Sequence, residues 1–295
     1  MERGNDYEKI VTDDCLGLPM LPNMQLEHVK SISTMKPRAE DIFVVTYPRS
    51  GTTWMTYIVW EILHNGEPLP AADDMVHRLA PFLDIVGVEG VEYLEPPRVM
   101  RIHLPYHLAP VSLKAKYIYV TRNPYDCCVS LYHFAQNMKS IYKFDGNFDD
   151  FFENFYRGNI PYGDYFDHLL SWFEHRRDPN VFFVSYEDMK INHEAVVCEV
   201  ADFLETPVKH DKKLVDKIVK NTEFSSLKSA HKVNISKLLL REESEKKEIS
   251  LNYFRKGEVG DWKNFFNQEQ KRLLDEMVAQ RLNAIDITTL WHGAM

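Results

Sequence analysis

A short segment, P-R-S-G-T-T at 48–53, combines the residue types that hold a phosphate or sulfate group. Gly51 lets the backbone come close to a ligand, and the N–H groups that follow it at a helix start point toward an anion. Arg49 adds a permanent positive charge and a forked set of donors. The segment is not the nucleoside-triphosphate P-loop, because it has one glycine and no lysine. We expect an anion site here, and a plain capped turn is the simpler alternative.

Other basic residues favour a second phosphate position. Arg122 follows an apolar run and precedes Asn-Pro and a helix that carries Ser130. Further along the chain, R-K-G at Arg255, Lys256 and Gly257 suits a loop that folds over a phosphate. Each feature has an ordinary alternative, an ion-paired arginine in the first case and a flexible basic loop in the second.

His103 is the candidate for proton transfer. It closes an apolar run and precedes Leu-Pro, and an imidazole with an unperturbed pKa of about 6.5 accepts a proton near neutral pH. A lone histidine is more often structural. Among the twelve histidines of the chain, His103 is the one that we expect beside the anion-binding segment.

Four short apolar runs must position these residues, and each fits a buried strand. Because helical patterns alternate with them, the sequence predicts a single α/β domain with a central parallel sheet flanked by helices. The predicted strands are 41–47, 98–102, 117–121 and 180–185, and the predicted helices are 53–64, one from 126, 148–157 and 164–175. Ligands of such sheets bind outside the carboxyl ends of the strands, where we expect Arg49, His103, Arg122 and Tyr186 to meet.

The composition is that of a globular protein in which one domain spans residues 1–295, with an ordered core at about 18–290. The chain is 44% hydrophobic and 27% charged, and 35 basic against 44 acidic residues give a net charge of −9. This charge argues against nucleic acid and membrane partners but allows a local basic cavity. The charge run at 241–248 fits a solvated helical face or a loop.

Several features predict a cytoplasmic protein. The N-terminal stretch has no apolar core of the signal-peptide kind, and no apolar run reaches the ~20 residues of a membrane helix. The four cysteines include no C-x-x-C pair, which is typical of a reducing compartment.

The motifs and their order resemble those of the cytosolic sulfotransferases. T-Y-P-R-S-G-T-T-W at 46–54 is similar to their P-loop-like 5′-phosphosulfate loop, and R-I-H-L-P at 101–105 is similar to their catalytic K-x-H-L-P. Y-V-T-R-N-P-Y-D-C-C-V-S at 119–130 resembles the strand and helix that bind a 3′-phosphate. Y-E-D-M at 186–189 and R-K-G-x-x-G-D-W at 255–262 also match, so the resemblance covers nearly the whole chain.

The resemblance implies a sulfotransferase that uses 3′-phosphoadenosine 5′-phosphosulfate (PAPS), leaves 3′-phosphoadenosine 5′-phosphate (PAP), and needs no metal. A small hydroxyl acceptor, such as a phenol, another alcohol or a hydroxyl-bearing monoamine, would attack in line, with His103 as general base and Arg49 as the second catalytic residue. The implied donor-binding residues are Arg49, Ser50, Gly51, Thr52, Thr53, Trp54, Arg122, Ser130, Tyr186, Thr222, Phe224, Arg255, Lys256 and Gly257. The implied acceptor-binding residues are Met24, Phe82, His103, Phe134 and Tyr162.

The sequence departs from the family pattern in three places. Arg49 and Arg101 stand where the family has lysine. The family's dimer motif keeps its lysine, Lys263, but is altered at three other positions, Asn267, Gln268 and Arg272. We therefore expect a monomer rather than the family dimer.

Two other function classes compete with this interpretation. An ATP-dependent small-molecule kinase would need G-K-[ST] and a metal-binding acid after a strand, and the sequence shows neither. A non-enzymatic nucleotide-binding module would have no need of His103 at a strand end. Within the sulfotransferase interpretation, Met138 stands where a catecholamine-preferring member has an acid, so we expect no ammonium salt bridge there.

Overall fold

The structure is a computed structural model that describes residues 7–22, 24–68, 79–230, 233–234, 250–251, 254–283 and 285–295. The charge run at 241–248 lies outside these residues. The strands are β1 Asp13–Cys15, β2 Leu18–Met20, β3 Asp41–Thr46, β4 Arg98–Ile102, β5 Lys116–Thr121, β6 Val181–Ser185, β7 Val233–Asn234 and β8 Ser250–Leu251. The α-helices are α1 Leu26–Ile32, α2 Thr52–Leu63, α4 Leu83–Val86, α5 Pro124–Asn137, α6 Lys139–Tyr142, α7 Phe148–Tyr156, α8 Tyr165–Phe173, α9 Tyr186–Ile191, α10 His193–Phe203, α11 Lys212–Asn221, α12 Phe224–Ala230, α14 Gln268–Arg281 and α15 Ile287–Leu290. Short 3₁₀ helices are η2 Glu89–Val91, η3 Tyr106–Leu108, η4 Pro207–His210 and η5 Asp261–Asn264.

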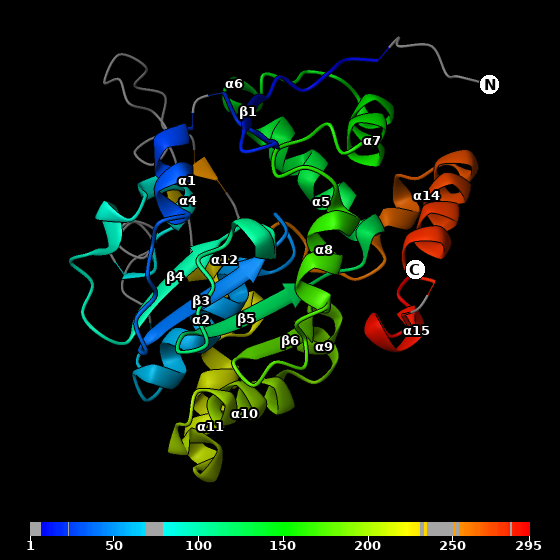
Figure 1. The fold of residues 1–295 in the computed structure, drawn as a ribbon. Helices are drawn as coiled ribbons and strands as arrows, with labels where there is room; N and C mark the ends of the chain where they lie inside the picture. Colours follow the sequence, from blue (N-terminus) through cyan, green and yellow to red (C-terminus); the bar gives the residue numbers. More distant parts are fainter. Residues whose placement is uncertain are drawn as a thin grey trace.

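A four-stranded parallel sheet in the order β4-β3-β5-β6 forms the centre of the fold (Figure 1). The predicted strands 41–47, 98–102, 117–121 and 180–185 match these four strands to within one residue at each end. Every residue of β3 is buried, which explains its continuous apolar run. The predicted α/β fold with a central parallel sheet is therefore confirmed.

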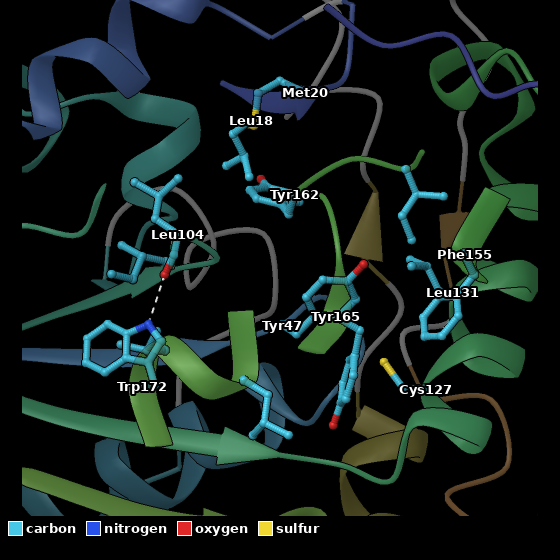
Figure 2. Packing of buried hydrophobic residues seen from close by; sticks show 14 of the residues in the cluster. Leu18, Met20, Tyr47, Leu104, Cys127, Leu131, Phe155, Tyr162, Tyr165 and Trp172 are labelled. Atoms are coloured by element: carbon cyan, nitrogen blue, oxygen red, sulfur yellow. Dashed lines mark hydrogen bonds between the residues drawn. The ribbon is translucent and has the colours of Figure 1, made fainter. Parts of the chain in front are cut away.

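Helices cover both faces of the sheet, because alternate side chains of β3 enter two different hydrophobic clusters. Ile42 and Val44 pack with α2, α10 and α11, whereas Phe43 and Val45 pack with α5, α7 and α8 on the other face (Figure 1). Figure 2 shows part of the second cluster, where the Trp172 Nε1–H donates to the Leu104 carbonyl at 3.1 Å. This bond ties α8 to the segment that follows β4.

Side-chain caps set where the helices near the sheet begin. The Asn123 side chain accepts the Asp126 N–H at 2.9 Å and Pro124 takes the first helical position, so α5 starts directly after β5. A capping box between Ser185 and Asp188 starts α9 directly after β6. Helices α7 and α8 occur where the amphipathic patterns at 148–157 and 164–175 predict them.

An N-terminal hairpin of β1 and β2, which no sequence pattern predicted, adds to the core. The Pro19 carbonyl accepts the Tyr162 N–H at 2.7 Å, which places the Tyr162 side chain beside the hairpin (Figure 2). Ile10, Cys15 and Trp291 are buried, so the core reaches beyond the expected range of 18–290 at both ends. Among the described residues, no helix has the length and apolar character needed to cross a lipid bilayer.

Glu61 in α2 makes the stability of the fold depend on pH. Its buried carboxyl accepts the Asn221 Nδ2–H at 3.0 Å. Burial raises the pKa of Glu61 from 4.5 to about 7, although Asn221 and Lys217 act to lower it. Since the folded protein then holds this proton more tightly than the unfolded chain, stability falls as the pH rises between these values.

We predict that Glu61→Gln reduces this pH dependence, because glutamine keeps the hydrogen bond and does not ionise. The free energy of unfolding of the native protein should fall between pH 5 and pH 8, with the share due to Glu61 on the order of 1 to 3 kcal/mol. Urea unfolding of both proteins at the two pH values measures the difference. An equal fall in the two proteins would contradict the prediction.

Candidate active site

A cavity opens at the carboxyl edge of the central sheet. The segments that follow β3, β4, β5 and β6 bring Arg49, His103, Arg122 and Tyr186 to its wall. The cavity encloses about 1230 Å³ of space, its opening to solvent included. This is the position where parallel α/β sheets bind their ligands.

Most of the site residues indicated by the sequence line this cavity. They are Met24, Arg49, Gly51, Thr52, Thr53, Trp54, Phe82, His103, Arg122, Ser130, Phe134, Tyr162, Tyr186, Phe224, Arg255, Lys256 and Gly257. Two do not line it. The Ser50 side chain is fully buried beside the thiol of Cys127, and Thr222 is buried with its carbonyl accepting the Trp54 Nε1–H at 2.8 Å. The Thr222 carbonyl therefore holds the Trp54 ring in place.

The cavity wall also contains Pro48 of the anion-binding segment and Met138, which the sequence analysis discussed without assigning them to the site. It further contains residues that the sequence did not single out: Leu21, Ile85, Tyr142, Phe254 and Glu258. Phe254 and Glu258 flank the R-K-G segment, so adjacency could have indicated them. Leu21, Ile85 and Tyr142 come from separate segments with no distinguishing pattern.

The turn from β3 into α2 has the geometry of an anion-binding loop. Gly51 is the N-cap of α2 with φ of 118°, and a Cβ there would lie 3.2 Å from the Tyr186 ring. The positive φ favours glycine, and the close approach to Tyr186 leaves little room for a side chain. Arg49 also has a positive φ, 71°, which is uncommon for a residue with a side chain. Helix α2 therefore begins at the cavity wall, where Thr52 and Thr53 are its first residues.

The Arg49 side chain contacts two residues of α5 that line the cavity, Ser130 and Phe134. Its Nε donates to Ser130 Oγ at 3.3 Å, and its guanidinium lies 4.7 Å from the centre of the Phe134 ring. The Arg49 carbonyl accepts a hydrogen bond from Arg122 at 3.3 Å. Two of the expected phosphate-binding cations are thus joined through the backbone of one loop.

The third group of cations is held by buried carboxylates. Arg255 and Lys256 donate to separate oxygens of Asp261, at 2.5 and 2.6 Å. Burial acts to raise the pKa of Asp261, but the bonds from Lys256 and Arg255 outweigh it and lower the pKa to about 2. Asp126 in α5 accepts the backbone N–H groups of Gly260 and Trp262, at 2.7 and 3.0 Å. The loop is therefore fixed to the helix that carries Ser130.

Aromatic rings and the R-K-G loop form one end of the cavity. Trp54 and Tyr186 lie edge to face with ring centres 5.4 Å apart, and the Arg122 guanidinium stacks 4.3 Å from the Tyr186 ring. Gly257 passes so close to Phe224 that a Cβ would lie 2.3 Å from the ring. Such an aromatic end suits a flat heterocycle next to anionic groups.

His103 stands at the other, more apolar end. Its ring lies 4.9 Å from Phe82 and 5.2 Å from Tyr162, measured between ring centres. Its Nδ1 lies 2.8 Å from the Thr46 carbonyl oxygen, which can only accept, so the neutral ring carries its proton on Nδ1 and a lone pair on Nε2. Burial lowers the pKa of His103 to about 4; the Thr46 bond opposes this shift, and Arg101 and Arg49 add to it. The ring is therefore a neutral proton acceptor at neutral pH.

The cavity is positive although the chain is acidic. Arg49, Arg122, Arg255 and Lys256 line it, and Glu258 is the one acid among its described lining residues. Within the described part of the chain, no group of three or more histidine, cysteine, aspartate or glutamate side chains is arranged to hold a metal ion.

Fold and site together define an α/β protein with an anion-binding loop and a neutral histidine in one cavity. The Sulfotransferase domain family model matches residues 39–286. Sulfotransferase 1E1 of Bos taurus is 35% identical over 90% of this chain and 91% of its own, and sulfotransferase 1C2 of Oryctolagus cuniculus is 34% identical over 87% and 88%. A crystal structure of mouse sulfotransferase SULT7A1 complexed with PAP matches with a TM-score of 0.78 and 29% identity, covering 96% of this chain and 98% of that one.

The chain belongs to the sulfotransferase family, and it is an enzyme of that class. The resemblance seen in the sequence is thereby confirmed, and neither the kinase nor the non-enzymatic binding module explains these matches.

The geometry of His103 makes a prediction for NMR. In uniformly ¹⁵N-labelled protein, the His103 ring should show the neutral form with its proton on Nδ1 and should not titrate between about pH 5 and pH 8. The spectrum of the His103→Asn variant assigns the signals. A titration midpoint near the ordinary histidine value would contradict the buried, carbonyl-bound ring.

Proposed function

We propose that this enzyme transfers the sulfuryl group of PAPS to a hydroxyl of a small acceptor, with His103 as the general base. The observation that carries the proposal is one continuous cavity that contains both an anion-binding aromatic end and a neutral histidine. A transfer reaction needs two such sites in contact, one for the donor and one for the acceptor.

The donor end fits a nucleotide with phosphate groups at two positions. The loop at 49–53 and the start of α2 would hold the 5′-phosphosulfate, and Arg122, Ser130 and the R-K-G loop would hold the 3′-phosphate. The Nε of Arg122 is buried and has no partner within the protein, which suits a phosphate oxygen. The PAP in the similar mouse enzyme supports the same nucleotide here.

The acceptor end fits a flat, neutral molecule. Met24, Phe82, Phe134, Tyr162 and Met138 present apolar or aromatic surfaces there. A phenol or another alcohol matches such walls, and a phenolic monoamine would find no carboxylate among the described residues of this end.

Different residues would accept the acceptor proton and stabilise the charge on the leaving group. His103 takes the acceptor proton on Nε2 as the acceptor oxygen approaches sulfur, an effect worth roughly 10²- to 10⁴-fold in rate. Arg49, the Thr52 hydroxyl and the N-terminus of α2 stabilise the charge that grows on the departing phosphate oxygen. Because the protein itself supplies the cations, the step needs no metal ion.

Two further properties follow the same proposal. We infer a monomer, because two of the three altered residues of the family's dimer motif have partners within the chain: Asn267 caps α14, and Arg272 pairs with Glu269 and Glu276. We also infer that the enzyme works in the cytoplasm as a single domain. Its four cysteines carry free thiols, as expected in a reducing compartment.

We predict that the purified protein sulfates simple phenols from PAPS. The His103→Ala substitution should lower this turnover by at least about 10²-fold. PAP affinity should stay close to that of the native protein, because His103 meets the acceptor and not the phosphates. Labelled-donor assays measure turnover, and calorimetry measures PAP binding. Substantial turnover by the alanine variant would refute the general-base role, and an inactive native protein would refute the proposed reaction.

The R-K-G loop gives a matched pair of glycine variants. Gly257 and Gly260 both have positive φ, 68° and 90°, so alanine strains the backbone at either position. A Cβ at 257 also meets Phe224, whereas a Cβ at 260 meets nothing within 4 Å. We predict that Gly257→Ala weakens PAP binding by on the order of 10-fold more than Gly260→Ala, since 1.4 kcal/mol of lost contact is about tenfold. Equal losses would show that Phe224 is not part of the nucleotide site.

A further inference from the structure

A buried carboxylate lies directly behind His103. Asp84, in α4, is fully buried, and its Oδ2 accepts the His103 backbone N–H at 3.0 Å. The chain reaches this position because Phe82 pairs with Arg101 as an extra bridge on the edge of β4. Asp84 is not part of the cavity wall and belongs to none of the predicted site residues.

Hydrogen bonds with three residues hold His103 in place. Besides the bond to Asp84, its ring donates to the Thr46 carbonyl, and its own carbonyl lies 3.1 Å from Nε2 of His168. The His168 ring is held in turn by the Tyr119 hydroxyl at 3.0 Å. Of these partners, Asp84 is the one that can carry a negative charge.

The Asp84 carboxyl is only partly satisfied. Its Oδ1 is buried and has no hydrogen-bond partner within the protein, which is uncommon for a carboxylate. Burial raises the pKa of Asp84 to about 6, although the His103 N–H, Tyr162 and Arg101 act to lower it. Asp84 is therefore ionised at neutral pH and takes up a proton in mild acid.

Few ionisable groups surround this carboxyl. Arg101 on β4, His103 after it and Tyr162 before α8 act on it directly. On α1, the His28 imidazole binds the Ile85 carbonyl at 2.5 Å. The remaining charged residues of α1 and η2 are exposed at the surface: Glu27, Lys30 and Glu89.

We propose that Asp84 is a positioning residue whose negative charge stabilises protonated His103. This inference rests on the proposed general-base role of His103. In the step, the acceptor O–H bond breaks and its proton goes to Nε2, the acceptor oxygen bonds to sulfur, and the sulfur–oxygen bond to the 5′-phosphate breaks with its electron pair on the phosphate. The imidazole becomes a cation in a buried site that otherwise disfavours charge. A fixed carboxylate next to its backbone offsets that cost in the transition state.

The experiment compares Asp84→Asn with a control at a second buried acid. Asparagine keeps the shape and can still accept the His103 N–H, so it removes mainly the charge. Glu61→Gln likewise neutralises a buried carboxyl with a raised pKa. Glu61 lies where α2 contacts α11 and has no contact with His103, so this variant is the control. Turnover, KM for the acceptor, PAP affinity and the pH profile of kcat are measured for native protein, both variants and His103→Ala.

We expect Asp84→Asn to lower kcat by on the order of 10- to 100-fold while acceptor KM and PAP affinity change little. The native kcat should fall as the pH drops through about 6, where Asp84 takes up its proton. This acidic limb of the pH profile should be missing in Asp84→Asn. Glu61→Gln should retain both the native kcat and the native limb.

Two results would overturn the inference while leaving the proposed function intact. One is a native kcat in Asp84→Asn when His103→Ala is inactive. The other is a lowered kcat with an unchanged acidic limb, which would mean that Asp84 acts only through packing. An inactive native protein, or an active His103→Ala, would instead count against the proposed function itself.

Discussion

The backbone turn that leaves β3 is the constraint on which the whole site depends. β3 lies between β4 and β5, so the groups at its carboxyl end are within reach of both neighbours. The Thr46 carbonyl orients the His103 ring, and the Arg49 carbonyl accepts a hydrogen bond from Arg122. Gly51 then starts α2. A shift of this turn would therefore move His103, Arg122 and the N-terminus of α2 at the same time.

Part of the positive charge at the cavity is paired with buried acids before any ligand enters. Four cations line a cavity in a protein whose net charge is −9. Asp261 takes one hydrogen bond from each of Arg255 and Lys256, and Asp126 fixes the backbone of their loop. These buried acids keep neighbouring cations from repelling one another and hold them in place. A bound anion would therefore meet donors that are already ordered, which reduces the entropy lost on binding.

The sequence predicted those parts of the fold and site that follow from local patterns. Continuous apolar runs identified the four central strands, because strands covered on both faces need no polar alternation. The turn at Gly51 was recognisable because a glycine directly before a helix lets an anion approach the free N–H groups of the first helical turn. Ser50 was assigned by its motif, but its side chain is buried beneath the turn.

The parts that the sequence did not predict depend on tertiary contacts. Asp84 reaches His103 across 19 residues, and no pattern in P-F-L-D distinguishes a carboxylate that turns inward from one at the surface. The β1–β2 hairpin consists of three-residue strands, which are too short for a periodic signal. Whether a residue of a short segment is buried or exposed depends on which other parts of the chain pack against that segment. A local sequence pattern does not contain these distant contacts.

The two arginines that stand where the family has lysine show how a conservative change alters geometry. Arg101 is buried; its Nε donates to the Ala80 carbonyl at 2.6 Å and its guanidinium stacks 4.0 Å from the Phe82 ring. Arg49 stacks on Phe134 in the same way. A planar guanidinium can pack on a ring and still donate hydrogen bonds, which a lysine ammonium on its flexible stem does less well. Each arginine thus supports an aromatic wall of the cavity while its charge stays next to His103. Both charges disfavour protonation of the buried imidazole. An ionised Asp84, bonded to the His103 backbone N–H, would offset this cost.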